Sequence, residues 1–183
     1  MMKTDLNRRD FLKKSAAAAA VLAFPNIVLA KSSTEVSVKS VSLYNIHTSE
    51  KADAVYWAEG RYIYDEIARL NHILRDFRTG ETHPIDTALF DLLHDLKSAV
   101  GSNASFHVIS GYRSPKTNEA LRSRSSGVAK RSLHMQGRAI DINLPGIGLD
   151  TLRLAARELR RGGVGYYPKS GFIHVDTGRV RYW

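Results

Sequence analysis

The spacing of hydrophobic residues divides the chain into extended and helical segments. Over residues 35–46 hydrophobic and polar positions alternate, and a second extended stretch covers residues 54–57. A period of two is typical of strands that bury one face. The polar residues 49–51 between the two stretches suit a turn. We therefore expect one or two strands over 35–46, followed by a strand that forms a hairpin with them.

Other segments have the period of a helix. Hydrophobic residues recur at intervals of three and four positions over 62–77 and 149–160, which predicts amphipathic helices. Asp86 is expected to cap a further helix, because an aspartate side chain accepts hydrogen bonds from the free N–H groups of a first turn. A shorter helix is expected over 117–123. The residues expected to form the buried stripe of the Asp86 helix are Leu89, Phe90, Leu92, Leu93 and Leu96.

Four short hydrophobic stretches complete the pattern. Residues 106–109, 139–142, 164–167 and 172–175 contain the β-branched and aromatic side chains that favour strands. The last two stretches are separated by residues 168–171 and form a second hairpin candidate. Helices that precede and separate short strands predict the α+β class. We expect one compact domain in which helices flank an antiparallel sheet.

Composition narrows the chemistry that the domain can perform. The chain has 183 residues, of which 43% are hydrophobic and 25% are charged, as in a globular domain. It contains no cysteine, which excludes thiolate metal sites, iron–sulfur clusters and cysteine nucleophiles. Any metal must therefore be held by histidine, aspartate or glutamate. The formal net charge of +9 favours an anionic partner, such as a phospholipid, a nucleic acid or an anionic polymer.

The first thirty residues have the features of an export signal. Arg8 and Arg9 are followed by Asp-Phe-Leu-Lys, an alanine-rich stretch and Ala30, a small residue suited to cleavage. This order resembles a twin-arginine signal, with Asn7 in place of the usual serine or threonine. A basic amphipathic helix or an uncleaved anchor is the alternative. Because Pro25 interrupts the apolar stretch, which is shorter than the about 20 residues of a span, we expect no stable membrane span.

Two histidines and one aspartate are placed to share one face of the expected sheet. Asp141 and His174 each lie in a predicted strand, and His134 lies on the loop that enters the Asp141 strand. In neighbouring strands Asp141 and His174 would point to the same face. Two imidazoles and a carboxylate suit Zn²⁺ and leave a fourth position for water. Zinc lowers the pKa of such a water to about 7 and polarises a carbonyl group, which is the chemistry of amide hydrolysis.

The residues around this group carry a specific motif. From Ser132 to Asp141 the chain reads Ser-Leu-His-Met-Gln-Gly-Arg-Ala-Ile-Asp and fits the pattern Ser-x-His-x-x-Gly-x-Ala-x-Asp. This pattern resembles the signature of zinc peptidases that act on cell-wall peptides. Their superfamily includes D-Ala-D-Ala metallopeptidases, murein endopeptidases, lysostaphin and hedgehog-type domains. Four further segments and the leader extend the resemblance, to the murein endopeptidase K group, over almost the whole chain: residues 45–48, 110–114, 162–168 and 172–178.

The resemblance implies a fold, an activity and a location. Residues 31–183 would form a compact α+β zinc peptidase domain, exported to the periplasm by a signal peptide of residues 1–30. The enzyme would hydrolyse peptide cross-links between the stem peptides of peptidoglycan, including links between two diaminopimelate residues. Nucleic acid is not expected as a partner, because the chain has no recognised binding motif and an exported protein seldom meets it. The oligomeric state stays open.

The resemblance also implies roles for single residues. His134, Asp141 and His174 would bind one zinc ion. Arg113, in a segment that resembles the arginine-bearing loop of the family, would face a substrate carboxylate or the oxyanion of the tetrahedral intermediate. A fixed cation at this place would stabilise developing negative charge.

One position departs from the wider family. Many relatives have a glutamate three residues before the last histidine ligand, or a histidine two residues before it, and here these positions are Gly171 and Phe172. The nearest carboxylate is Asp176, which would face the same side of its strand as His174. Asp176 could be the general base, or it could orient an imidazole as a second partner. Both roles stay open.

Several other residues have two interpretations each. Tyr166 and the neighbouring Tyr167 would line a substrate groove or pack in the core. Ser132 would form a hydrogen bond near the site, as a candidate for binding substrate, or it would shape a turn. A basic loop would contact stem carboxylates or be a solvated run of charge; it contains Arg122, Arg124, Lys130 and Arg131. The remaining histidines are expected to be structural or exposed: His47, His72, His83, His94 and His107.

Two alternative functions stay open on the sequence alone. A carboxypeptidase that releases a terminal D-amino acid would use the same fold, because substrate choice depends on the shape of the groove. A non-catalytic wall-binding module with zinc is favoured by Gly171 in place of the family glutamate. The presence of Arg113 and of all three ligand positions argues against the module.

Overall fold

The structure is a computed structural model, which describes residues 37–125 and 127–183. The expected signal peptide of residues 1–30 and the first two residues of the expected strand at 35–46 lie outside the described residues. None of the helices in the described part of the chain has the length and apolar character needed to cross a membrane.

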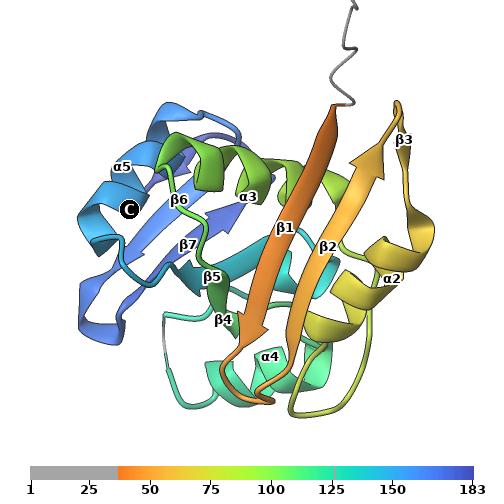
Figure 1. Cartoon of the computed structure of the whole chain (residues 1–183). Coiled ribbons are helices and arrows are strands. Elements are labelled where there is room, and N and C mark those ends of the chain that lie inside the picture. The colour runs from red at the N-terminus through yellow and green to blue at the C-terminus, as the bar shows by residue number, and fades with distance from the viewer. Residues whose placement is uncertain (1–36, 126) are drawn as a thin grey trace, which may run out of the picture. The chain divides into compact units, whose positions relative to one another are not determined.

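The described residues from 37 onward form one eight-stranded sheet with helices packed against it (Figure 1). Across the sheet the strands follow the order β3-β2-β1-β4-β5-β7-β6-β8. Both predicted hairpins are present, because β1 pairs antiparallel with β2, and β6 pairs antiparallel with β7. In chain order the strands are β1 (Val38–Asn45), β2 (Lys51–Ala58), β3 (Arg61–Tyr62), β4 (Phe106–Ser110), β5 (Ala139–Asn143), β6 (Gly163–Tyr167), β7 (Phe172–Asp176) and β8 (Arg181–Tyr182).

The α+β class is confirmed, and the sheet is mixed rather than purely antiparallel. The four strands β4, β5, β7 and β6 run antiparallel to one another, as expected for the part that bears the site. The parallel pairs are β1 with β4 and β6 with β8. The chain between β1 and β4 passes through two helices, and a long connection of this kind is what a parallel pair requires. Strands β3 and β8 have two residues each, too few to show a period in the sequence.

The helices follow the predicted hydrophobic pattern. Asp86 caps α3 as expected, since its Oδ1 accepts a hydrogen bond of 3.0 Å from the N–H of Ala88. All residues of the expected apolar stripe on this helix are buried. The helices are α2 (Tyr64–Ile73), α3 (Thr87–Ala99), α4 (Pro115–Arg122) and α5 (Leu149–Glu158), and the 3₁₀ turns are η1 (Leu133–Gln136) and η2 (Pro168–Ser170).

Helix α2 ends at Ile73 rather than at the expected Phe77. The carbonyl oxygen of Ile73 accepts a hydrogen bond of 2.9 Å from Asn45 Nδ2, and that of Leu74 accepts one of 2.7 Å from the N–H of Tyr112. A longer helix would need these carbonyls for its own N–H groups. The early end therefore fixes the loop after β4, which carries Tyr112, against the end of α2.

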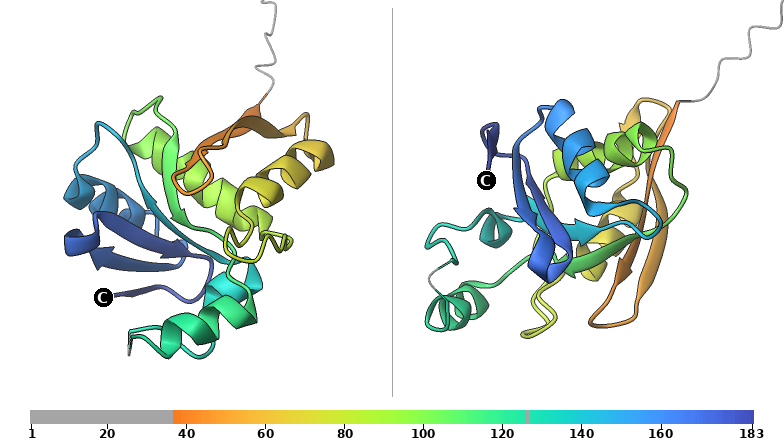
Figure 2. Two further views of the ribbon diagram at one scale, coloured as in Figure 1. Left: turned by 90° about the horizontal axis from the view of Figure 1, so that it is seen from below. Right: turned by 90° about the vertical axis from the view of Figure 1, so that its left-hand side faces the viewer.

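The sheet separates the hydrophobic core from the opposite face. Helices α2, α3 and α5 contribute to one core cluster. Because side chains alternate along a strand, Asp141 and His174 face the other side. Figure 2 shows α4 and the segment that follows it on the side of the strands away from α3 and α5. The core cluster includes Ile140 and Ile142 of β5 and Ile173 and Val175 of β7, which are all completely buried.

Candidate metal centre

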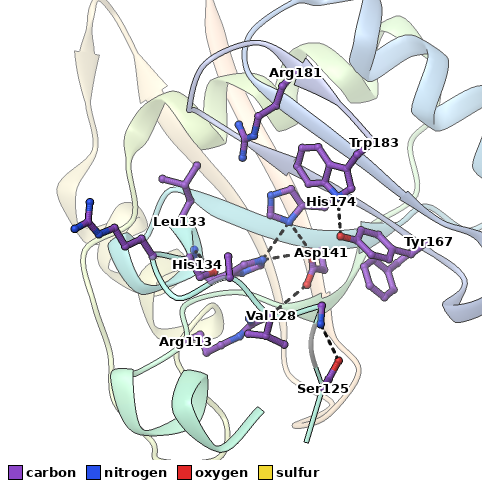
Figure 3. Close-up of a pocket in the computed structure, with 15 residues that line it drawn as sticks. Arg113, Ser125, Val128, Leu133, His134, Asp141, Tyr167, His174, Arg181 and Trp183 are labelled. Atoms are coloured by element: carbon purple, nitrogen blue, oxygen red, sulfur yellow. Dashed lines mark hydrogen bonds and ion pairs between the residues drawn. The ribbon is translucent and has the colours of Figure 1, made fainter. Parts of the chain in front are cut away.

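Three side chains converge on one point of the sheet face opposite the core (Figure 3). His134 Nε2 lies 3.2 Å from His174 Nδ1 and 3.3 Å from Asp141 Oδ1. His174 Nδ1 lies 2.8 Å from the same carboxylate oxygen. All three residues are buried, with exposed fractions of 3% for His134, 7% for Asp141 and 9% for His174. The structure thus brings together the three residues that the family resemblance implies as metal ligands, in a group that could hold an ion.

The local folding explains the spacing of the motif. Asp141 of β5 lies directly opposite His174 of β7 in an antiparallel ladder, so that both point to the same face. His134 lies in η1, and the hydroxyl of the cap residue Ser132 accepts a bond of 3.4 Å from the N–H of His134. Gly137 ends η1 with a φ of 64°, a left-handed conformation that favours glycine. The turn at Gly137 directs the chain into β5 and brings His134 beside Asp141.

The outer nitrogen of each imidazole is bound to an acceptor. His134 Nδ1 donates a bond of 2.8 Å to the carbonyl oxygen of Gly111, and His174 Nε2 donates one of 3.0 Å to Asp176 Oδ2. A carbonyl and an ionised carboxylate can only accept, so these two nitrogens carry the ring hydrogens. The inner nitrogens therefore present lone pairs to the carboxylate oxygen of Asp141. Two nitrogen ligands and one oxygen ligand fit a tetrahedral metal site with a fourth position left open.

The charges of the group favour a bound cation. Burial would raise the pKa of Asp141, but His134 and His174 lower it well below its usual range. Burial would lower the pKa of His174, but the carboxylates of Asp141 and Asp176 outweigh this effect and raise it. The surroundings therefore keep Asp141 ionised and stabilise positive charge next to the imidazoles.

Asp176 lies behind His174 and not within the group. Its Oδ2 accepts bonds of 3.0 Å from His174 Nε2 and 2.7 Å from Arg181 Nη2. Its Oδ1 accepts bonds from the N–H groups of Gly163 and Gly178, at 3.0 and 2.8 Å. Burial would raise the pKa of this carboxyl, but the hydrogen bonds with His174 and Arg181 lower it far below its usual range. Both oxygens are thus occupied on the side of the imidazole that is remote from the ligand atoms.

Arg113 holds a positive charge at the edge of the group. Its Nη2 lies 3.8 Å from Asp141 Oδ2 and donates a bond of 3.3 Å to Ser110 Oγ. Its Nη1 donates a bond of 3.5 Å to Asn118 Oδ1. The backbone N–H of Arg113 donates to the carbonyl oxygen of His134 at 3.2 Å. These contacts fix the guanidinium beside the ligand atoms, where the family resemblance implied a cation.

The group opens into a cavity of about 480 Å³. Tyr167 lines the cavity, whereas Tyr166 packs against the core with the guanidinium of Arg153 4.6 Å from its ring centroid. Since successive strand residues face opposite sides, only one of these tyrosines can reach the cavity. The structure thus places Tyr167, and not the expected Tyr166, at the cavity. Among the lining residues that the structure describes, Asp141 is the only carboxylate.

Among the cavity residues that the sequence did not indicate, two belong to the last three residues of the chain. Arg181 and Trp183 line the cavity, because β8 pairs with β6 and brings the last residues of the chain beside His174. Neither residue belongs to a motif, and β8 is too short to be recognised by its period. Ser132 and Arg113 line the cavity as expected. The only histidines among the described lining residues are the two of the metal group.

Comparison with known families gives a match over most of the chain. Residues 32–183 match the family described as peptidoglycan L,D-endopeptidase MepK. Residues 5–25 match the signal sequence of the twin-arginine translocation pathway. The twin-arginine signal predicted from Arg8 and Arg9 is confirmed.

Known relatives match from end to end. The peptidoglycan L,D-endopeptidase MepK of Escherichia coli (strain K12) is 43% identical over 183 residues, which cover 100% of both chains. The protein of the same name from Shigella flexneri has the same identity and coverage. A relative from Haemophilus influenzae, named "probable peptidoglycan L,D-endopeptidase MepK", is 39% identical over 184 residues, which cover 100% of this chain and 98% of the relative.

Proposed function

Because the chain belongs to the family of the peptidoglycan L,D-endopeptidases MepK, we propose that it hydrolyses peptide cross-links of peptidoglycan with the help of one zinc ion. The resemblance seen in the motif is confirmed, and the chain is a peptidase. The observation that carries the proposal is the convergence of His134, Asp141 and His174 beside a cavity that also contains Arg113. The bond cleaved joins an L-centre to a D-centre, as in a link between two diaminopimelate residues.

His134 Nε2, Asp141 Oδ1 and His174 Nδ1 would hold the zinc ion, because these three atoms lie close together in one group. When bound in such a site, zinc supplies a water of lowered pKa and polarises a carbonyl group. The chain itself holds the three ligand atoms in place and keeps both imidazole lone pairs directed at the same point. The absence of cysteine agrees with a nitrogen and oxygen ligand set.

Asp176 orients His174 in this proposal and does not act as the general base. Its carboxylate accepts a hydrogen bond from His174 Nε2. It also accepts hydrogen bonds from Arg181 and from two backbone N–H groups. A carboxylate in this position fixes the ring and raises the basicity of the nitrogen that binds the metal. It is fully buried, with an exposed fraction of 0%, so water in the cavity does not reach it.

Arg113 stabilises negative charge on the substrate. Its guanidinium lies beside Asp141 at the cavity, and an arginine stays protonated at physiological pH. A fixed cation lowers the free energy of an oxyanion more than that of a neutral carbonyl, which accelerates the reaction. Ser132 contributes by capping η1, and it lies in the wall of the cavity.

The proposed place of action is the periplasm. The twin-arginine signal sequence supports export out of the cytoplasm. Cross-linked stem peptides are found outside the inner membrane, and their carboxylates are attracted to residues 31–183, which have a net charge of +6 without the signal peptide.

The test is a cleavage assay on purified muropeptide dimers. The protein is incubated with dimers linked through two diaminopimelate residues, with and without a chelator, and its metal content is measured. We expect conversion of dimers to monomers, loss of this activity with chelator and recovery with Zn²⁺. His134→Ala serves as the control that retains the cavity but lacks a ligand.

Two results would contradict the proposal. Release of a terminal D-amino acid from free stems without cleavage of dimers would favour the carboxypeptidase. Binding to cell-wall sacculi without any metal-dependent release of peptides would favour the wall-binding module.

A further inference from the structure

One wall of the cavity consists of three aromatic side chains that support one another. The rings of Tyr167 and Phe172 are stacked, with centroids 4.8 Å apart and an interplanar angle of 22°. Trp183 Nε1 donates a hydrogen bond of 2.8 Å to Tyr167 Oη. The indole ring of Trp183 also lies 5.4 Å from the ring of His174. Figure 3 shows Tyr167 and Trp183 on the side of the site away from Arg113.

Gly165 allows the indole ring to take this position. Trp183 continues the pairing of β8 with β6, because its N–H donates to Val164 O at 3.3 Å and its own carbonyl accepts from the N–H of Tyr166 at 3.0 Å. A Cβ at position 165 would lie 2.7 Å from the indole ring, closer than such atoms approach. The missing side chain of Gly165 therefore leaves room for the indole, whose N–H then reaches Tyr167.

The indole leaves the hydroxyl hydrogen of Tyr167 free for the cavity. An indole N–H can only donate, so Tyr167 Oη is the acceptor in this pair. No acceptor for the hydroxyl hydrogen of Tyr167 is found among residues 37–125 and 127–183. Accepting one hydrogen bond makes a hydroxyl a stronger donor, because linked hydrogen bonds polarise each other. Tyr166 does not line the cavity, since its ring packs on the core side beside Arg153.

Phe172 supports the ring of Tyr167 from the neighbouring strand β7. It lies in β7, two residues before His174. Its ring cannot donate a hydrogen bond, but it stacks on Tyr167 and fixes the plane of the phenol. The cavity thus has a polar donor on this side, the hydroxyl of Tyr167 from β6.

We propose that Tyr167 is a further catalytic residue, whose hydroxyl donates a hydrogen bond to the scissile carbonyl oxygen as negative charge develops on it. This role rests on the proposed peptidase function. A donor held in advance by two neighbours loses little entropy when the charge develops, which is the condition for strong electrostatic stabilisation. Tyr167 and Arg113 then act on the substrate from opposite sides of the metal group.

The test compares Tyr167→Phe with Tyr166→Phe, two substitutions that each remove one hydroxyl from neighbouring residues on opposite faces. We expect Tyr167→Phe to lower kcat about 100-fold while KM and metal content stay close to those of the unmodified protein. Tyr166→Phe should keep kcat within about twofold. A phosphinate pseudopeptide, whose tetrahedral oxygens imitate the intermediate, should bind about 100-fold more weakly to Tyr167→Phe, in proportion to kcat.

A second variant tests the part played by Trp183. Trp183→Phe keeps an aromatic ring but removes the N–H, and we expect kcat to fall about fivefold. Added to Tyr167→Phe, it should have no further effect on kcat, because the indole acts through the hydroxyl.

Four results would overturn the role of Tyr167. They are an unchanged kcat in Tyr167→Phe, a loss confined to KM, a loss of bound metal in this variant, and phosphinate binding that does not change. In each case metal-dependent cleavage of dimers by the unmodified protein would leave the proposed function intact. Failure of the unmodified protein to cleave dimers would instead refute the proposed function.

Discussion

The two histidines of the metal group are supported by regions of different construction. His134 is held by backbone: its ring donates to the carbonyl oxygen of Gly111, and its own carbonyl accepts from the N–H of Arg113. His174 is held by charged side chains: its ring donates to Asp176, which is bound by both terminal nitrogens of Arg181.

The difference separates two tasks of the same site. A neutral carbonyl fixes the direction of an imidazole, whereas a carboxylate also raises the basicity of the nitrogen that binds the metal. We call His134 with Gly111 and Arg113 the His134 region, and His174 with Asp176 and Arg181 the His174 region. We therefore infer that the His134 region sets the geometry of the centre, and that the His174 region sets its affinity for the metal. Substitutions that affect one region and spare the other can break or sharpen this comparison.

The largest effect is expected when the metal ligand of either region is removed, and it should be equal for the two regions. His134→Ala and His174→Ala each remove one of three ligands, so both should abolish stoichiometric metal binding. Without the electrostatic stabilisation supplied by the metal, kcat/KM should fall about 1,000-fold or more. Metal analysis and muropeptide assays measure both quantities. An active, metal-loaded variant at either position would show that the ligand set is wrong.

Asp176→Asn removes the charge of the His174 region alone. We expect metal affinity to fall about 10- to 100-fold, because the amide no longer raises the basicity of His174. Competition with a chromophoric chelator measures this affinity. At saturating metal, kcat should largely recover. If affinity stayed normal and kcat alone collapsed, Asp176 would be the general base after all; if both stayed normal, neither role would hold.

Gly111→Ala perturbs the His134 region, which has no supporting side chain on the ring to remove. A Cβ at this position would lie 2.5 Å from the carbonyl oxygen of Leu74, so the loop has to move. We expect a loss of about 2 kcal/mol in the free energy of unfolding, with a smaller change in metal affinity than for Asp176→Asn. Urea unfolding and the chelator assay provide the two values. A larger loss of metal affinity than in Asp176→Asn would contradict the division of tasks.

Gly165→Ala should have a still smaller effect, confined to the aromatic wall. The added methyl displaces the indole of Trp183 and breaks its bond to Tyr167, while the metal ligands keep their supports. We expect normal metal affinity, a shifted tryptophan fluorescence spectrum and a kcat lowered about fivefold. Unchanged fluorescence would show that the indole has another position in solution.

The smallest effect concerns stability at acidic pH. Asp76 is buried and accepts hydrogen bonds from the N–H groups of Ser114 and Arg78, next to the loop of Arg113. Burial would raise its pKa, but hydrogen bonds with Thr117 and Ser114 lower it below the usual 3.8. Because the folded pKa is the lower one, this stabilisation is present above pH 3.8 and is lost as the pH falls through the folded pKa.

In Asp76→Asn the free energy of unfolding should therefore fall less steeply as the pH is lowered. The control is the same denaturation series on the unmodified protein without metal, at pH 6 and below. An equal decline in stability for both proteins would show that Asp76 does not carry this dependence.

The two regions also differ in how far the sequence predicts them. The His134 region is encoded locally, because Ser132, His134, Gly137 and Asp141 form a cap, a 3₁₀ turn and the entry to β5 within ten residues. The stripe of α3 was predicted completely for the same reason, since helical contacts repeat at short intervals.

The His174 region depends on pairing between distant strands. The parallel pairing of β8 with β6 places Arg181 and Trp183 at the cavity, and no local period indicates it. Strand register also decides whether Tyr166 or Tyr167 faces the cavity, because a shift of one residue exchanges the two faces. The role of Asp176 stayed open in the sequence for this reason, and its bonds to His174 and Arg181 required the structure.

The most direct test of the central claim is a crystal structure of the metal-loaded protein with anomalous scattering data at the zinc edge. We predict one peak, about 2 Å from His134 Nε2, Asp141 Oδ1 and His174 Nδ1, with His174 Nε2 still donating to Asp176. A peak at another group of residues, or a metal bound through His174 Nε2, would contradict the account.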